Sequence, residues 1–348
     1  MKKESYKQLF PLILIIVLLL AGCGSAAAEP TAIPTLASTE TAIPEPTLTP
    51  TPAIPLALLI VPADMDQEIS DVYQTLVYNL AQSAGMRFQV RNTLTMADLE
   101  PSLRVVIALP PDPGLMELAA AAPQAQFLSV NIPDMVAGGN LSVLANTNRP
   151  DIAAFISGYI AAMITEDYRT GLLIPKDDQL GQITLAAFHN GFDYYCGTCT
   201  AFIYPSWCAT APCYPQHVEI PAEEDPVAYN AYSDFLVLQR QVETMYIAPQ
   251  FATPELLTYL SSSGVLVISD LSPQQKLGNW VATIQPDVIH AIETAWPQLI
   301  SGAGGVNITS PLILVDVSPE HLPPGKEQQA QDILAQLQAG YILTGVNP

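Results

Sequence analysis

Basic residues are scarce in this chain, and that scarcity limits the partners it can bind. It has 12 lysine and arginine residues against 33 aspartate and glutamate residues, a formal net charge of −21. A surface this acidic repels nucleic acid and anionic lipid head groups, so we expect no nucleic-acid partner. Only 13% of the residues are charged and 49% are hydrophobic, so 348 residues can still build a large core.

The signatures of common enzyme classes are also missing. The sequence has no GxxxxGK[ST], GxSxG or HExxH motif and no GxGxxG after a strand. The four histidines lack the spacing of metal ligands, and the carboxylates form no catalytic motif; the histidines are His189, His217, His290 and His321. We expect no enzymatic activity, no catalytic residue, no metal and no cofactor, with a motif-free hydrolase as the alternative.

The N-terminus contains the features of an export signal. Lys2, Lys3 and Lys7 precede an apolar run from Phe10 to Leu20, which is too short to span a bilayer comfortably. The run ends in Leu20-Ala21-Gly22-Cys23, which resembles the bacterial lipobox L-[AS]-[GA]-C. This resemblance implies a signal peptide at 1–22, a lipidated Cys23, and a mature protein anchored outside the cytoplasm by acyl chains. An ordinary signal peptide or a membrane anchor, either with a chance cysteine, is the alternative.

Residues 24–55 contain seven prolines and many threonines but no aromatic or basic residue. Proline at this density removes backbone donors and favours extended polyproline II, so the segment cannot form a packed core. With Cys23 it predicts a tether, 23–55, between the membrane and a domain.

Four of the five cysteines lie in one short block, Asp193–Pro215, among six aromatic residues. Cys196, Cys199, Cys208 and Cys213 have the spacing C-x₂-C-x₈-C-x₄-C. An extracytoplasmic location favours two disulfides, and four cysteines allow three pairings. A zinc site and a redox centre are the alternatives, although only the first pair has the spacing of a zinc knuckle.

Strand-like and helix-like segments alternate from residue 56 onwards. Leu56–Val61 and Arg104–Leu109 are short apolar strand candidates, and helical patterns such as 71–85, 151–165 and 326–339 lie between strands. This order predicts an α/β protein, and so many strands fit two doubly wound, Rossmann-like parallel sheets better than one.

Several segments resemble the basic membrane protein family of substrate-binding lipoproteins. The best match is LSVLANTNRPDIAAFISGYIAAMIT (141–165); weaker ones follow the family's order at 126–144, 169–194, 265–270 and 322–342. The resemblance implies a type I periplasmic binding protein with two hinged lobes and three crossovers. The expected boundaries are 56–165 for lobe 1, 166–279 for lobe 2 with the cysteine-rich excursion 193–215, 280–303 for the return to lobe 1, and 304–348 for the return to lobe 2.

Ligands of doubly wound sheets bind at the carboxyl ends of strands. The candidate ligand-binding residues are therefore those that follow strands: Asp64, Asp66, Asp112, Asn131, Asp177, Phe251 and Asp270. Each is also a residue type that suits a turn or a helix cap, except Phe251.

The sequence departs from the nucleoside-binding members of that family. Their two base-stacking aromatics correspond to Ile69 and to Ala222 or Glu223, and the acid of their F-A-x-I-D motif corresponds to Asn131. Their later basic residue corresponds to Gln285 or Pro286, so only the ribose-type contact Asp270 is kept. We expect a monomer that delivers a small polar, nucleoside-like solute to the permease of an ABC importer by cleft closure. A surface sensor or scaffold with the same fold but no transport role is the alternative.

Overall fold

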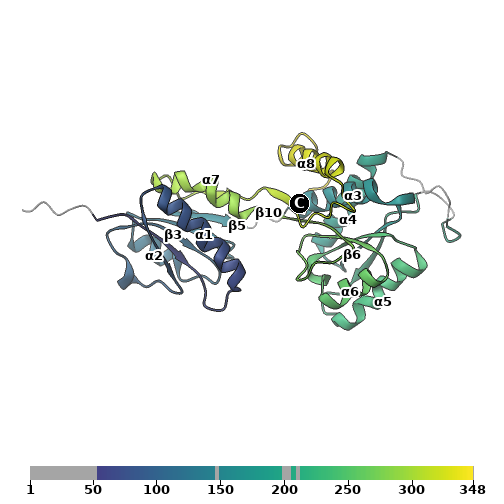
Figure 1. Ribbon diagram of the computed structural model, residues 1–348, viewed down its shortest axis with the longest axis horizontal. Helices are drawn as coiled ribbons and strands as arrows, with labels where there is room; N and C mark the ends of the chain where they lie inside the picture. Colours follow the sequence, from purple (N-terminus) through teal and green to yellow (C-terminus); the bar gives the residue numbers. More distant parts are fainter. Residues whose placement is uncertain (1–52, 146–148, 198–204, 209–211, 348) are drawn as a thin grey trace, which may run out of the picture. The chain divides into compact units, whose positions relative to one another are not determined.

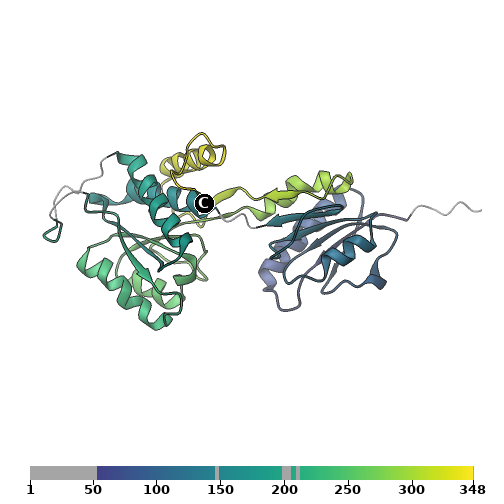
Figure 2. The same cartoon turned by 180° about the vertical axis from the view of Figure 1, so that it is seen from behind.

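The computed structural model describes residues 53–145, 149–197, 205–208 and 212–347, which form two α/β lobes (Figures 1 and 2). The sheet of the first lobe has the order β11-β5-β4-β3-β1-β2, and all neighbouring strands are parallel. Its strands are β1 (Leu56–Ile60), β2 (Arg87–Arg91), β3 (Leu103–Ala108), β4 (Gln126–Val130), β5 (Leu141–Ala145) and β11 (Asn307–Thr309).

Both faces of the first sheet are buried, as parallel sheets require. Successive residues of β1 show this: Ala57 and Leu59 pack into one core, and Leu56, Leu58 and Ile60 into the other. The first core is covered by α1 (Gln67–Ser83) and α7 (Val288–Ile300), and the second by α2 (Leu115–Ala121). The apolar run at 56–61 is therefore a strand buried on both sides.

The sheet of the second lobe has the order β12-β10-β9-β8-β6-β7. Every neighbouring pair is parallel except β10 and β12, which are antiparallel. The strands are β6 (Thr170–Pro175), β7 (Gln216–Ile220), β8 (Thr244–Ile247), β9 (Leu266–Ser269), β10 (Trp280–Pro286) and β12 (Leu312–Val315). One face carries α3 (Pro150–Ile164) and α4 (Gln179–Cys196), and the other carries α5 (Tyr229–Asp234) and α6 (Pro254–Ser262) (Figures 1 and 2).

Helix α3 is buried almost from end to end, because it lies between the sheet, α4 and α8 (Pro324–Gln338). Two glycines let α3 and α4 approach closely. A Cβ on Gly158 would lie 2.1 Å from the Phe188 carbonyl oxygen, and one on Gly191 would lie 1.9 Å from the Phe155 carbonyl oxygen. Each helix thus presents a glycine to the phenylalanine backbone of the other.

The lobe boundaries differ from those expected. The chain passes between the lobes after β5, after β10 and after β11, so α3 packs on the second sheet although it was expected in the first lobe. Likewise β10, expected in the return to lobe 1, is a strand of the second sheet, and the return comprises α7 and β11. An apolar pattern identifies a strand or a helix but does not show which sheet it joins.

Residues 226–239 form three consecutive helical parts. A 3₁₀ turn (Pro226–Ala228) leads into α5, and a π-helix (Phe235–Gln239) follows. Other 3₁₀ turns lie at Met96–Asp98, Glu166–Tyr168 and Pro249–Phe251. Across the described ranges, each helix is too short or too polar to cross a membrane.

Candidate functional site

The candidate residues of each lobe lie beyond the carboxyl ends of its strands, because the strands that they follow are parallel neighbours in the sheet. In the first lobe β1, β3 and β4 are adjacent, which places Asp64, Asp112 and Asn131 beyond the same edge. In the second lobe β6, β8 and β9 are adjacent, which places Asp177, Phe251 and Asp270 beyond one edge. The parallel topology needed for a binding site at strand ends is therefore present in each lobe.

Two of these carboxylates accept hydrogen bonds from backbone N–H groups at the start of helices. Asp66 accepts hydrogen bonds from the backbone N–H groups of Glu68 (2.9 Å) and Ile69 (3.2 Å) at the start of α1. Asp112 accepts from Gly114 (3.0 Å) and Leu115 (2.9 Å) before α2. Such bonds satisfy donors that a helix leaves unpaired at its N-terminus. Asp64 is exposed in the turn between β1 and α1.

Asn131 and Asp177 adopt the left-handed backbone conformation, with φ of 52° and 54°. Few residues other than glycine adopt it, and asparagine and aspartate do so most readily. The Asn131 Oδ1 atom is buried without a hydrogen-bond partner among the described residues. Asn131 therefore keeps a buried acceptor without a described partner, whereas Asp177 is exposed.

Asp270 is the most perturbed carboxylate of the second sheet edge. Its Oδ2 accepts a 2.7 Å hydrogen bond from the Tyr246 hydroxyl, and its Oδ1 is buried without a partner in the described part of the chain. Burial raises the pKa of Asp270 to about 7, against the opposing effect of the Tyr246 hydrogen bond. Burial also raises the pKa of Tyr246 well above its ordinary value, so the tyrosine remains a donor.

A second carboxylate, Asp316, lies on the same lobe and was missed by the sequence reasoning. Its Oδ2 accepts hydrogen bonds from Ser272 Oγ (2.6 Å) and Thr283 Oγ1 (2.9 Å). Thr283 in turn accepts from the Trp280 indole N–H at 3.1 Å. Asp316 follows β12 with φ of 51°, and β12 lies beside β10 only through an antiparallel pairing. We call Ser272, Thr283 and Asp316 the acceptor cluster.

A pocket of about 510 Å³ borders the acceptor cluster. Asp316 and Trp280 line it together with the loop before β10 and the segment after Asp316, which contribute Lys276 and Glu320. This volume lies within the range of small-molecule sites, roughly 300–1,000 Å³. The pocket therefore offers two carboxylates, one ammonium group and an indole ring to a ligand.

Phe251 lies in the core. Its side chain is 1% exposed, and its ring meets that of Tyr229 edge-on with centroids 5.2 Å apart. Phe251 follows β8 as expected, but its ring is buried in the core of the second lobe. Its role as a ligand contact stays a prediction that this packing does not support.

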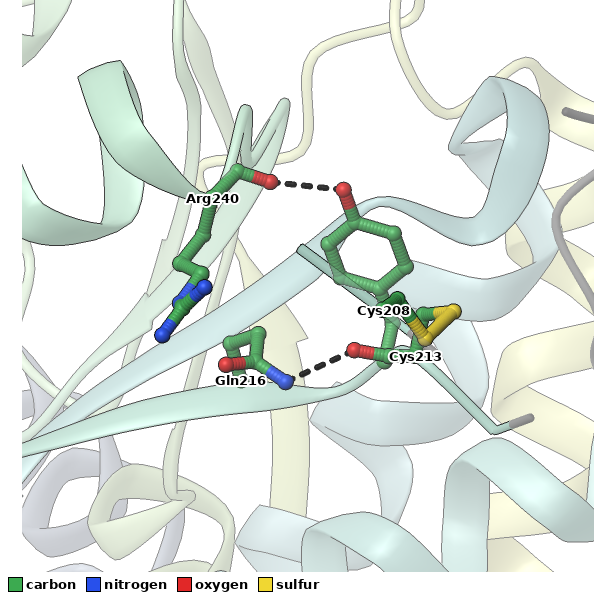
Figure 3. Close-up of a disulfide and its surroundings, with 5 residues drawn as sticks. Cys208, Cys213, Gln216 and Arg240 are labelled. Atoms are coloured by element: carbon green, nitrogen blue, oxygen red, sulfur yellow. Dashed lines mark hydrogen bonds between the residues drawn. A yellow bond between two sulfur atoms is a disulfide. The ribbon is translucent and has the colours of Figure 1, made fainter. Parts of the chain in front are cut away.

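The cysteine block contains a disulfide between Cys208 and Cys213 (Figure 3). Cys196 is also disulfide-bonded, and Cys199 lies outside the described residues. A bond between Cys208 and Cys213 excludes a four-cysteine zinc site, since both thiols are consumed. No group of three metal-binding side chains occurs within the described ranges.

Tyr214 and Arg240 connect this disulfide to the body of the second lobe. The Tyr214 hydroxyl donates to the Arg240 carbonyl oxygen at 2.6 Å, and Gln216 Nε2 donates to the Cys213 carbonyl at 2.7 Å (Figure 3). The Arg240 guanidinium lies 4.6 Å from the ring centroids of both Trp207 and Phe235.

The block joins the sheet at its amino end. Gln216, the first residue of β7, pairs with Gly171 at the start of β6, and the candidate ligand residues lie at the other edge. The described part of the cysteine block therefore lies at the opposite end of the strands from the candidate ligand-binding residues.

Comparison with known proteins supports the fold. No protein-family model matches the sequence, and no curated protein matches it. An ABC transporter solute-binding protein from Conexibacter woesei aligns with a TM-score of 0.55 at 12% identity, over 84% of this chain and 98% of that one. A transcriptional activator of the comK gene from Bacillus halodurans aligns with a TM-score of 0.51 at 14% identity, over 82% and 98%. The architecture is that of type I periplasmic binding proteins, as expected.

Proposed function

We propose that this chain is an extracytoplasmic solute-binding lipoprotein, anchored through Cys23, that delivers a small polar solute to an ABC importer. The observation that carries the proposal is the acceptor cluster, whose Asp316 lines a pocket of the second lobe. Two lobes that close on a solute bury it, so binding energy selects the closed state, which a permease can recognise. The solute-binding protein with the same fold supports this role.

The polar groups favour a solute rich in hydrogen-bond donors. Asp270 Oδ1 and Asn131 Oδ1 are buried acceptors without partners among the described residues. A hydroxyl or ammonium group satisfies such acceptors, whereas leaving them unpaired is costly. Polyols, pentoses and amines meet this requirement.

A nucleoside is a narrower possibility within the same class. The positions where the basic membrane protein family carries stacking aromatics hold Ile69, Ala222 and Glu223, and all three side chains are exposed. A base stacked on an aromatic ring gains roughly 1–3 kcal/mol per ring, which this chain does not provide at those positions. The pentose-type contact of Asp270 is the part of a nucleoside site that this chain retains.

Native mass spectrometry of the domain without its tether, purified from an oxidising compartment, tests the proposal. The protein is measured alone and with a panel of nucleosides, sugars, polyols and amines. We expect a solute adduct, weakened about 2- to 12-fold by Asp270→Asn if one hydrogen bond worth roughly 0.5–1.5 kcal/mol is lost. Asp332→Asn on the exposed face of α8 is the matched control and should bind as the parent does.

No adduct across the panel would contradict solute binding and favour a sensor or scaffold, in which a partner protein recognises the domain. The similarity to a transcriptional activator with the same fold is the observation that supports this second function.

A further inference from the structure

The chain segments that enter and leave the second lobe are held by side chains near the C-terminus. Gln338, the last residue of α8, forms two hydrogen bonds with the backbone of Leu312, the first residue of β12 after the third crossover. Its Oε1 accepts from the Leu312 N–H at 2.6 Å, and its Nε2 donates to the Leu312 carbonyl at 3.1 Å. One side chain thus satisfies both backbone groups of a residue at a crossover.

The restraint on the third crossover extends to the second. The Asp287 N–H donates to the Pro311 carbonyl at 2.7 Å, and Pro286 pairs with Leu312 in the antiparallel ladder. The Asp287 side chain also caps α7, accepting from the His290 N–H at 3.0 Å. A side chain that fixes Leu312 therefore also fixes the residue from which α7 begins.

The start of α3, which follows the first crossover, is held by a second contact from the C-terminal segment. Arg149, just before α3, donates from Nε and Nη2 to the two oxygens of Asp151, each at 2.8 Å. Asp151 is fully buried, and its Oδ2 also accepts from the Thr344 hydroxyl at 2.9 Å. Asn190 on α4 donates to the Thr344 carbonyl at 2.8 Å, which fixes Thr344 in turn.

We propose that Gln338 and Thr344 form a C-terminal clamp that sets the stiffness of the hinge between the lobes. Hinge residues absorb changes in φ and ψ when lobes move, and side-chain hydrogen bonds to their backbone restrict those changes. Both residues are positioning residues, because they act on Leu312, Asp151 and Arg149. The consequence for solute affinity depends on the proposed function, whereas the restraint on lobe motion does not.

Lobe motion can be measured in the full mature chain without a solute. Pulsed dipolar spectroscopy gives the distance distribution between one spin label on α1 and one on α6, attached through non-natural amino acids so that the disulfides stay intact. Hydrogen exchange at the Leu312 and Asp287 amides is measured in parallel. Gln338→Leu should broaden the distribution and speed Leu312 exchange at least tenfold.

Matched variants separate the clamp from general destabilisation. Gln336→Leu, two residues away on the exposed surface of α8, should change neither readout. Thr344→Val should broaden the distribution, whereas Thr344→Ser, which keeps the hydroxyl, should restore it. If Thr344→Val does not fold, Gln338→Leu with its Gln336→Leu control remains decisive.

An unchanged distance distribution in Gln338→Leu, despite faster exchange at Leu312, would overturn the proposal. Equal broadening in Gln336→Leu would also overturn it. Failure of the solute-binding function is a separate result: the solute panel would give no adduct while the clamp variants still broaden the distribution.

Discussion

The Tyr246 hydroxyl and Asp270 Oδ2 lie 2.7 Å apart at the carboxyl edge of the second sheet, and the other Asp270 oxygen is buried without a described partner. One hydrogen bond does not compensate the loss of hydration around a carboxylate, so the neutral acid is favoured. Burial raises the pKa of Asp270 to about 7 for this reason.

This raised pKa predicts how stability changes with pH. The folded state holds the Asp270 proton more tightly than the unfolded state, whose pKa is near the ordinary value of 3.8. The stabilisation is therefore fully present below pH 4 and is lost as the pH rises towards 7. Relative to Asp270→Asn, the wild type should lose about 2–4 kcal/mol of unfolding free energy between pH 4 and pH 8, at about 1.4 kcal/mol per pKa unit.

Urea denaturation of both proteins at several pH values measures this difference and cancels the titration of groups they share. A wild-type-minus-variant difference that is flat from pH 4 to pH 8 would show that Asp270 is ionised throughout. Tyr246→Phe serves as a second comparison, because it removes the donor but keeps the carboxylate.

Most strands could be predicted from the sequence because they carry their own signal. The strand around Leu58 is apolar at every position, and the strand around Val267 is apolar except for its last residue, Ser269. This is the pattern of a strand covered on both faces. Strand β11 was missed, because its three residues, Asn307–Thr309, are too few and too polar to give such a pattern.

Half of the second-lobe site could not be predicted in this way. Asp270 directly follows an apolar strand, so the rule for parallel sheets identifies it. Asp316 reaches the site through the antiparallel strand β12, whose pairing with β10 depends on tertiary structure. Its partners Ser272 and Thr283 are 44 and 33 residues away in the sequence, a separation that no local motif encodes.

The reciprocal glycines of α3 and α4 predict a steric effect on stability. Gly158→Ala and Gly191→Ala each place a methyl group about 2 Å from a carbonyl oxygen of the facing helix. The helices must separate to accept it, so we expect each variant to lose about 2–3 kcal/mol of unfolding free energy, the cost of overpacking a core. Thermal and urea denaturation provide the measurement.

Gly325→Ala is the control for this pair. Gly325 lies in the first turn of α8 with no atom within 4 Å of the added Cβ. The substitution should be neutral or should stabilise the protein by about 0.5–1 kcal/mol, because alanine restricts the unfolded chain more than glycine does. If all three variants lose equal stability, helix packing is not the cause.

The Cys208–Cys213 disulfide predicts a modest and local contribution to stability. It joins cysteines with a sequence separation of only 5, for which loop-closure entropy gives about 2 kcal/mol. Cys208→Ala with Cys213→Ala should therefore lower the unfolding free energy by about this amount. Hydrogen exchange should increase around Tyr214 and Arg240 and remain unchanged in the first lobe.

Arg240→Lys tests the packing around the same disulfide. Lysine keeps the charge but loses the planar group that lies against Trp207 and Phe235. A loss of stability in Arg240→Lys with none in the double alanine variant would show that the aromatic contacts hold the segment without the disulfide.

Cys23 carries the last prediction, which concerns the membrane anchor. The thiol is the atom to which diacylglycerol would be attached, so Cys23→Ser should abolish incorporation of an alkyne-labelled fatty acid and release the protein from the membrane fraction. Ala21→Ser keeps a small residue in the position that the lipobox allows and should stay lipidated. Each methylene group of an acyl chain that is buried in the bilayer contributes about 0.8 kcal/mol to membrane binding. Without the chains, the acidic domain is repelled by anionic lipid head groups and should leave the membrane. Membrane retention of Cys23→Ser without label would instead show that residues 10–20 remain uncleaved as the anchor.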